Sequence, residues 1–95
     1  MVVGVLRLEL LLHAPLSLKE KRSVVKRILG RCRERFPVSC AEVDLHDLWQ
    51  RAILGFSMVG QTEDESHKVF HRIEEEIERL GSAEIIERFV EFLHY

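Results

Sequence analysis

The sequence has few cysteines, which can cross-link a small domain, and few prolines, which interrupt its helices and strands. It holds two prolines and two cysteines, and Cys32 and Cys40 do not form a CxxC pair. They would make a poor framework for a secreted domain, so we expect reduced thiols in a cytoplasmic protein. The longest apolar run, residues 2–12, contains Arg7 and Glu9 and is too short and too charged to span a bilayer. No cleavage-site pattern follows it, so we predict neither a signal peptide nor a membrane partner.

What the sequence does contain is typical of one globular domain. Hydrophobic residues make up 46% of its 95 residues and charged residues 32%, so the chain is far from the composition of disordered proteins. We therefore predict a single domain over residues 1–95. The net charge of −2 argues against a general binder of polyanions, although a local basic patch remains compatible with it.

Alternating and helical apolar patterns predict six elements. Strands are expected over residues 2–12, 38–46, 51–59 and 83–92, with a turn at 47–50. In the second strand, Ala41, Val43 and Leu45 form the more apolar row, which we expect to face the core. Capping boxes at residues 17–20 and 62–65 predict helices that end near Glu34 or Arg35 and at Gly81.

The order βαββαβ predicts a ferredoxin-like fold, an α/β (α+β) two-layer sandwich. It has a four-stranded antiparallel sheet with two helices on one face. In this topology the second strand runs parallel to the first, so the turn after it lies at the end of the sheet where the first helix begins. The segments SLKEKRS, at residues 17–23, and DLHDLWQR, at residues 44–51, are therefore expected to converge.

With those segments in place, the chain resembles the YlxP-like family of small bacterial proteins of unknown function. The resemblance rests on SLKEKRS at 17–23 and on EVDLHDLWQRAILG at 42–55, and it runs essentially end to end. It implies a ferredoxin-like fold and a cytoplasmic bacterial protein. Family members are often encoded beside translation and ribosome-maturation factors, which implies work on RNA or ribosomal particles. The resemblance implies no catalytic residues.

No motif predicts an enzyme or a cofactor. The sequence shows no P-loop and no Ser/His/Asp arrangement, and the segment HAPLS at 13–17 lacks the glycine or arginine of an acylphosphatase-like phosphate loop. His67 and His71 have the spacing of paired zinc ligands, but Lys68 stands where the HExxH motif has glutamate. We therefore expect a non-enzymatic protein with no cofactor.

The first helix concentrates positive charge. Residues 17–37 contain eight bases and two acids, a net charge of +6, whereas the remainder carries −8. Lys19, Lys21 and Arg22 lie in the first turns, where the helix dipole favours anions and disfavours cations. This helix is either a solvated face or a contact for an anion or an RNA backbone. Lys21 points near the apolar stripe, and it can reach over the sheet edge or pair with Asp44 or Asp47.

The hairpin segment offers further polar and aromatic side chains. Glu42, Asp44 and His46 are spaced by two, which would place them on one strand face as metal ligands or as partners of arginines. No further ligand stands at matching spacing, so we predict no metal. Trp49 either covers the end of the core, or anchors a partner protein or serves as a stacking platform for a base. The candidate binding residues are Lys19, Lys21, Arg22, Asp44, His46, Trp49, Gln50 and Arg51.

Both faces of the predicted sheet are partly apolar. Helices on one face cannot cover both, so we expect a homodimer or a partner on the other face. The third strand, RAILGFSMV, lacks the aromatic residues with which RRM domains stack RNA bases, and the first strand has none. The function predicted is therefore RNA or ribosomal-particle binding through the basic helix and Trp49, and the alternative is a protein-interaction module or homodimer without nucleic acid.

Overall fold

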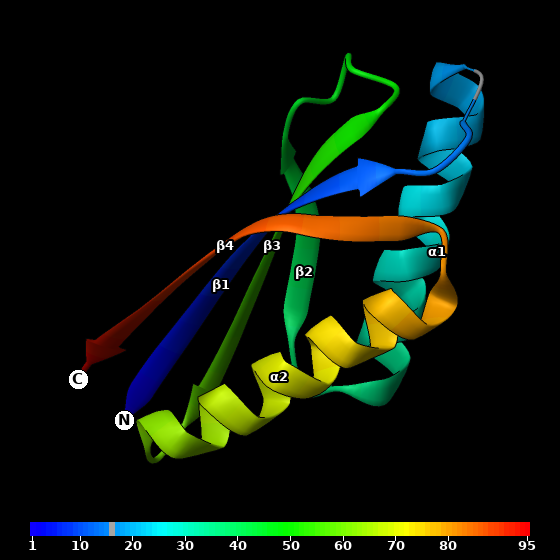
Figure 1. Cartoon of the computed structure of the whole chain (residues 1–95). Helices are drawn as coiled ribbons and strands as arrows, with labels where there is room; N and C mark the ends of the chain where they lie inside the picture. The colour runs from blue at the N-terminus through cyan, green and yellow to red at the C-terminus, as the bar shows by residue number, and fades with distance from the viewer. Residues whose placement is uncertain (16) are drawn as a thin grey trace.

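The computed structural model describes residues 1–15 and 17–95, which form four strands and two helices (Figure 1). Their bounds are β1 Val2–Leu12, α1 Leu18–Arg35, β2 Ser39–Asp44, β3 Arg51–Gly60, α2 Glu63–Leu80 and β4 Ala83–His94. The strands form one antiparallel sheet in the order β2-β3-β1-β4. This topology confirms the predicted ferredoxin-like sandwich with both helices on one face.

The core lies between the helices and the sheet and is built on β1. The even-numbered residues from Leu6 to Leu12 are leucines that are at most 4% exposed, as a period of two residues predicts. From α2, Phe70 and Ile73 are fully buried against this row, and α1 contributes Ile28. The opposite side of the sheet has no layer over it among the described residues.

Both helices begin where the capping boxes predict. Ser17 Oγ accepts a hydrogen bond from Glu20 N and Thr62 Oγ1 accepts one from Glu65 N, each at 3.2 Å. These bonds satisfy amide groups that have no partner inside the helix. Gly81 ends α2 with φ of 74°, a left-handed conformation that glycine adopts without strain. Within the described residues, neither helix has the length and apolar character needed to cross a membrane.

The prediction for the core-facing row of β2 was wrong. Ala41 and Val43 lie on the open side of the sheet, and Val43 is 50% exposed. Cys40 and Glu42 face the helices instead: Cys40 packs against the core, and Glu42 pairs with a lysine of α1. β2 is an edge strand whose inner side meets that polar partner, so its inward row need not be apolar. The strand also ends at Asp44, two residues earlier than predicted.

Candidate binding rim

The start of α1 and the β2–β3 loop, residues 45–50, meet at one end of the molecule, which we call the rim. β1 and β2 both pair antiparallel with β3, so they run in the same direction and end at the same side. Figure 1 shows the first turns of α1 and the loop together at the top of the view. Lys21 Nζ donates a hydrogen bond to Leu45 O at 2.6 Å, which ties the two segments directly. The predicted convergence is therefore confirmed.

Lys21 itself is a buried anchor of the rim. Its side chain has no solvent exposure, and Nζ lies 2.8 Å from Glu42 Oε2 and 3.5 Å from His46 O. The contact with Glu42 is too poorly angled for a hydrogen bond, so charge attraction is its main component. A buried ammonium group needs such partners, because leaving water costs several kcal/mol. Lys21 pairs with neither aspartate considered from the sequence, and its burial removes it from the surface that a ligand would contact.

Asp44 and His46 shape the loop. Asp44 Oδ1 accepts a hydrogen bond from Leu45 N at 2.7 Å, and His46 Nε2 lies 3.2 Å from Glu42 O. Leu45, which was expected in the core-facing row, has φ of 60° and begins the turn that Leu48 N closes by donating to Leu45 O. A left-handed leucine is strained, so contacts such as that of Lys21 Nζ with its carbonyl are needed to hold it.

Glu42, Asp44 and His46 do not share one face as their spacing suggested. The β2–β3 register shifts between Glu42 and Asp44, so that Glu42 lies opposite the buried Leu54 and Asp44 lies opposite Ile53 on the other side. Within residues 1–15 and 17–95, no group of three His, Cys, Asp or Glu side chains is arranged to hold a metal ion.

Trp49 stands at the surface of the rim. It is 41% exposed and its neighbour Leu48 is 48% exposed, so Trp49 does not cover the end of the core. Leu48, Trp49, Gln50 and Arg51 line a hollow of about 270 Å³. Arg51 is held at 3.0 Å from Glu9 Oε2, an ion pair that solvent screens from the side of the half-exposed arginine.

Seven exposed bases of α1 divide between two flanks of the helix. At 3.6 residues per turn, one flank carries Lys19, Arg22, Lys26 and Arg33, and the other carries Arg27, Arg31 and Arg35. The first flank lies beside β2, because Arg33 donates a hydrogen bond to Cys40 O at 2.7 Å. The second faces α2, where Arg31 and Arg35 lie 3.3 and 2.7 Å from Glu76 Oε1.

Glu76 neutralises much of the second flank. It is 5% exposed and also accepts hydrogen bonds from Arg79 on its own helix. The hydrogen bond from Arg79, followed by that from Arg35, lowers the pKa of this carboxyl, although burial opposes the shift. This cluster was not predicted from the sequence. Its available signal was the position of Glu76 beside Ile73 and Ile77 on the inward stripe of α2.

The basic side chains that have no partner inside the protein are the candidates for contact with a ligand. Among the described residues, four exposed cations of α1 have neither an ion pair nor a side-chain hydrogen bond: Lys19, Arg22, Lys26 and Arg27. Lys19 and Arg22 belong to the rim, and Lys26 extends the same flank by one turn. The rim thus combines unpaired positive charge with an exposed indole, while the buried Lys21 and the exposed Asp44 and His46 hold the loop through contacts with its backbone.

Comparisons with known proteins agree with the sequence pattern. The family model "Protein of unknown function (DUF503)" matches residues 3–89. The "Uncharacterized protein YlxP" of Bacillus subtilis is 40% identical over 72 residues, which cover 76% of this chain and 78% of that protein. These matches confirm the resemblance noted above.

Two solved structures have a similar chain path. The "De novo designed protein Foldit4" covers 99% of this chain and 97% of its own with a TM-score of 0.50 and 18% identity. The protein At3g17210 from Arabidopsis thaliana covers 100% of this chain and 95% of its own with a TM-score of 0.48 and 17% identity. At such identity the first of these supports the fold alone.

Proposed function

The chain belongs to the DUF503 family of proteins of unknown function and is similar to YlxP, and from this premise we propose a non-enzymatic protein that binds RNA at its rim. The RNA is free or exposed on a ribosomal particle. Lys19, Arg22 and Lys26 contact the phosphate backbone, and Trp49 stacks on an unpaired base.

The observation that carries this proposal is the uneven pairing of the bases of α1. Arg31 and Arg35 are held by Glu76, whereas Lys19, Arg22 and Lys26 lie exposed on the flank beside β2 without an acidic partner in the described residues. These three span about 10 Å of helix. Cations without an internal partner need not break an ion pair when they contact phosphates, and counterions are released on binding.

Trp49 adds a contact that phosphate binding alone does not supply. Its indole is 41% exposed beside the hollow formed with Gln50 and Arg51. Single-stranded RNA offers unpaired bases, which stack on aromatic side chains without regard to sequence. Phosphate contacts from α1 and one stacked base together predict binding of single strands with little sequence preference.

The experiment measures binding of a fluorescent single-stranded RNA between about 50 and 200 mM salt. For single strands, the logarithm of the affinity falls with the logarithm of salt by about 0.7 for each phosphate contact. Replacing Lys19, Arg22 and Lys26 by alanine together is expected to reduce this slope by about 2. The matched control replaces Lys68 and Arg72, two exposed bases of α2, and is expected to leave the slope unchanged.

Trp49 gives a second readout in the same titration, because it is the single tryptophan of the chain. RNA is expected to quench its fluorescence, and Trp49→Ala is expected to lower affinity by about tenfold or more, whereas Leu48→Ala is not. Absence of binding at low salt would remove the RNA proposal. A Trp49-dependent protein partner with weak salt dependence would instead support the alternative, a protein-interaction module.

A further inference from the structure

The side of the sheet away from the helices is apolar and uncovered in the described residues. It carries the odd-numbered residues of β1 and their cross-strand neighbours on β3 and β4. Four large apolar side chains on this face are exposed by 40% or more: Val43, Val59, Phe89 and Leu93. Beside them a shallow hollow of about 340 Å³ is lined mainly by small residues, among them Ala41, Gly55 and Ser57. A face of this kind marks an interface.

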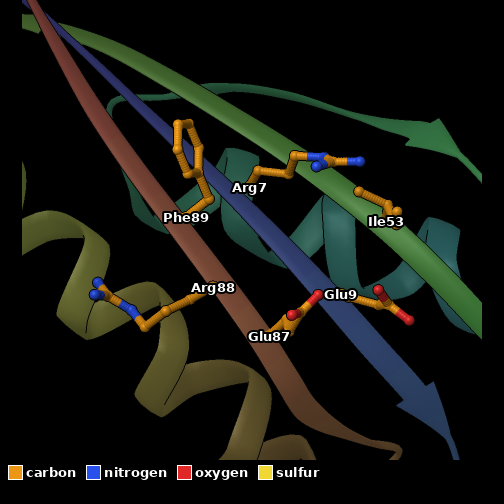
Figure 2. Close-up of a pocket in the computed structure, with 6 residues that line it drawn as sticks. All are labelled: Arg7, Glu9, Ile53, Glu87, Arg88 and Phe89. Atoms are coloured by element: carbon orange, nitrogen blue, oxygen red, sulfur yellow. The ribbon is translucent and has the colours of Figure 1, made fainter.

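The centre of the face carries charges of both signs. Figure 2 shows Arg7, Glu9, Ile53, Glu87 and Phe89 around a hollow of about 260 Å³, whereas Arg88 extends toward α2 and binds Glu74 there. Glu9 is paired with Arg51, but Arg7 and Glu87 have no ion pair among residues 1–15 and 17–95.

Within one chain, the pairing of the strands places charged side chains at the centre of this face where they repel each other or have no partner of opposite charge. Glu9 and Glu87 lie directly opposite each other on neighbouring strands, and like charges in this position repel. Arg7 lies opposite Phe89, one row away from the two acids. At the centre of the face, the row of Arg7 and the row of Glu9 and Glu87 are complementary, because turning a second copy over brings these unlike rows together, while Glu84 and Glu91 of β4 meet nearer the margin.

We propose that this face binds a second copy of the chain. The two-fold axis runs across the strands, midway between the row of Arg7 and Phe89 and the row of Glu9 and Glu87. Arg7 of each copy then faces the acidic row of the other, and Leu11 of each copy faces Val5 of the other. Two packed sheets are rotated against each other by about 30°, and this rotation shifts the rows next to the axis least from the positions opposite their partners.

The size of the face suits such a dimer. Strands of 11, 6, 10 and 12 residues, each residue rising about 3.3 Å and neighbouring strands about 4.8 Å apart, give a surface of about 620 Å², near the lower end of the range of standard interfaces. Stable interfaces bury about 800 Å² on each partner. The rim lies at one end of the strands and stays outside this contact, so the dimer does not depend on RNA binding.

Two charge reversals test the proposal. In Arg7→Glu both copies present acids at the centre, and in Glu87→Arg the introduced arginine of each copy lies diagonally across from Arg7 of the other. Each variant is expected to weaken self-association by about tenfold or more, and Arg7→Glu is expected to weaken it further because Glu9 is also present. Sedimentation measures the association, and Lys68→Glu on α2 is the control for a change in net charge.

The decisive experiment mixes the two variants and asks whether they associate with each other. In the heterodimer, the glutamate introduced at position 7 of one chain lies diagonally across, one strand to the side, from the arginine introduced at position 87 of the other. The unchanged Arg7 and Glu87 also lie diagonally across from each other, so association is expected to recover well above that of either variant alone, although the introduced glutamate still faces Glu9. This recovery also shows that both variants are folded, and thermal melting of each checks it independently. A monomeric wild-type chain, variants that still dimerise, or a mixture that stays monomeric would each overturn the proposal.

Discussion

At the scale of single residues, the buried Lys21 decides how the rim is built. Its ammonium group replaces lost hydration with Glu42 Oε2 and with the carbonyl of Leu45, whose φ is positive. Removing one member of a buried ion pair leaves the other charge without compensation, whereas removing both is often nearly neutral. Leu45 O keeps a second donor, Leu48 N at 3.1 Å, if Lys21 is lost.

Lys21→Met is therefore expected to destabilise the protein by about 3 kcal/mol. The double variant Lys21→Met with Glu42→Leu is expected to recover most of this loss. Chemical denaturation measures both, and Trp49 fluorescence reports loosening of the loop. Folded Lys21→Met should keep the salt slope of RNA binding, which separates an internal anchor from a phosphate contact. Equal stability of the single variant and wild type would contradict this role.

The burial of Lys21 shows where prediction from sequence stops. Its position between Leu18 and Val25 on the apolar stripe was visible, and it placed the side chain near the core. Lysine is almost never fully buried without a partner, however, and the partner depends on which face of β2 turns inward. Strand alternation places Glu42 and Asp44 in the same row, and the register shift that turns Glu42 inward and Asp44 outward leaves no signal in the sequence, so the sequence could not choose Glu42 over Asp44 or Asp47.

At the scale of elements, the ion pairs between α1 and α2 in the described residues all involve one carboxylate, that of Glu76. Glu76 contacts Arg31 and Arg35 of α1 and Arg79 of its own helix. Its pKa lies below the ordinary value of 4.5, chiefly because of the hydrogen bond from Arg79, so the folded protein favours the charged form. This contribution to stability is present above the unfolded pKa and is lost as pH falls through the folded one.

Glu76→Gln is accordingly expected to destabilise the protein near neutral pH and to have little effect in acid, where the wild-type carboxyl is protonated. Denaturation of both proteins from neutral pH to below pH 4.5 measures the difference, which should shrink on the acid side. Glu78→Gln is the control, since Glu78 is exposed on the same helix and its side chain has no ion pair in the described residues. A difference that does not change with pH would contradict the assignment.

The helices and strands could be predicted from local sequence patterns, because each is determined by interactions between residues that are close in the sequence. The capping boxes at Ser17 and Thr62, the left-handed Gly81 and the leucine row of β1 all act within a few residues. The convergence of α1 with the β2–β3 loop followed from topology alone. The inward row of β2 and the register shift before Asp44 did not, because they depend on packing against a helix distant in sequence.

At the scale of the whole molecule, the two proposals place their surfaces on different sides. The rim lies at the end of β1 and β2, and the dimer contact covers the open face of the sheet. Because the proposed axis crosses the strands, the strands of the two copies run in opposite directions. Their rims therefore point to opposite ends of the dimer, and each chain is 42 Å long.

A dimer of this shape is expected to hold long RNA more tightly than short RNA. An RNA that reaches both rims binds the second one as an intramolecular step, so avidity exceeds the affinity of a single rim. Arg7→Glu is expected to lower affinity for such an RNA by about tenfold or more, while an oligonucleotide that covers one rim loses little. Mixing Arg7→Glu with Glu87→Arg should restore the difference between long and short RNA. Equal losses for both lengths would mean that Arg7 contacts RNA directly and that the two surfaces are not separate.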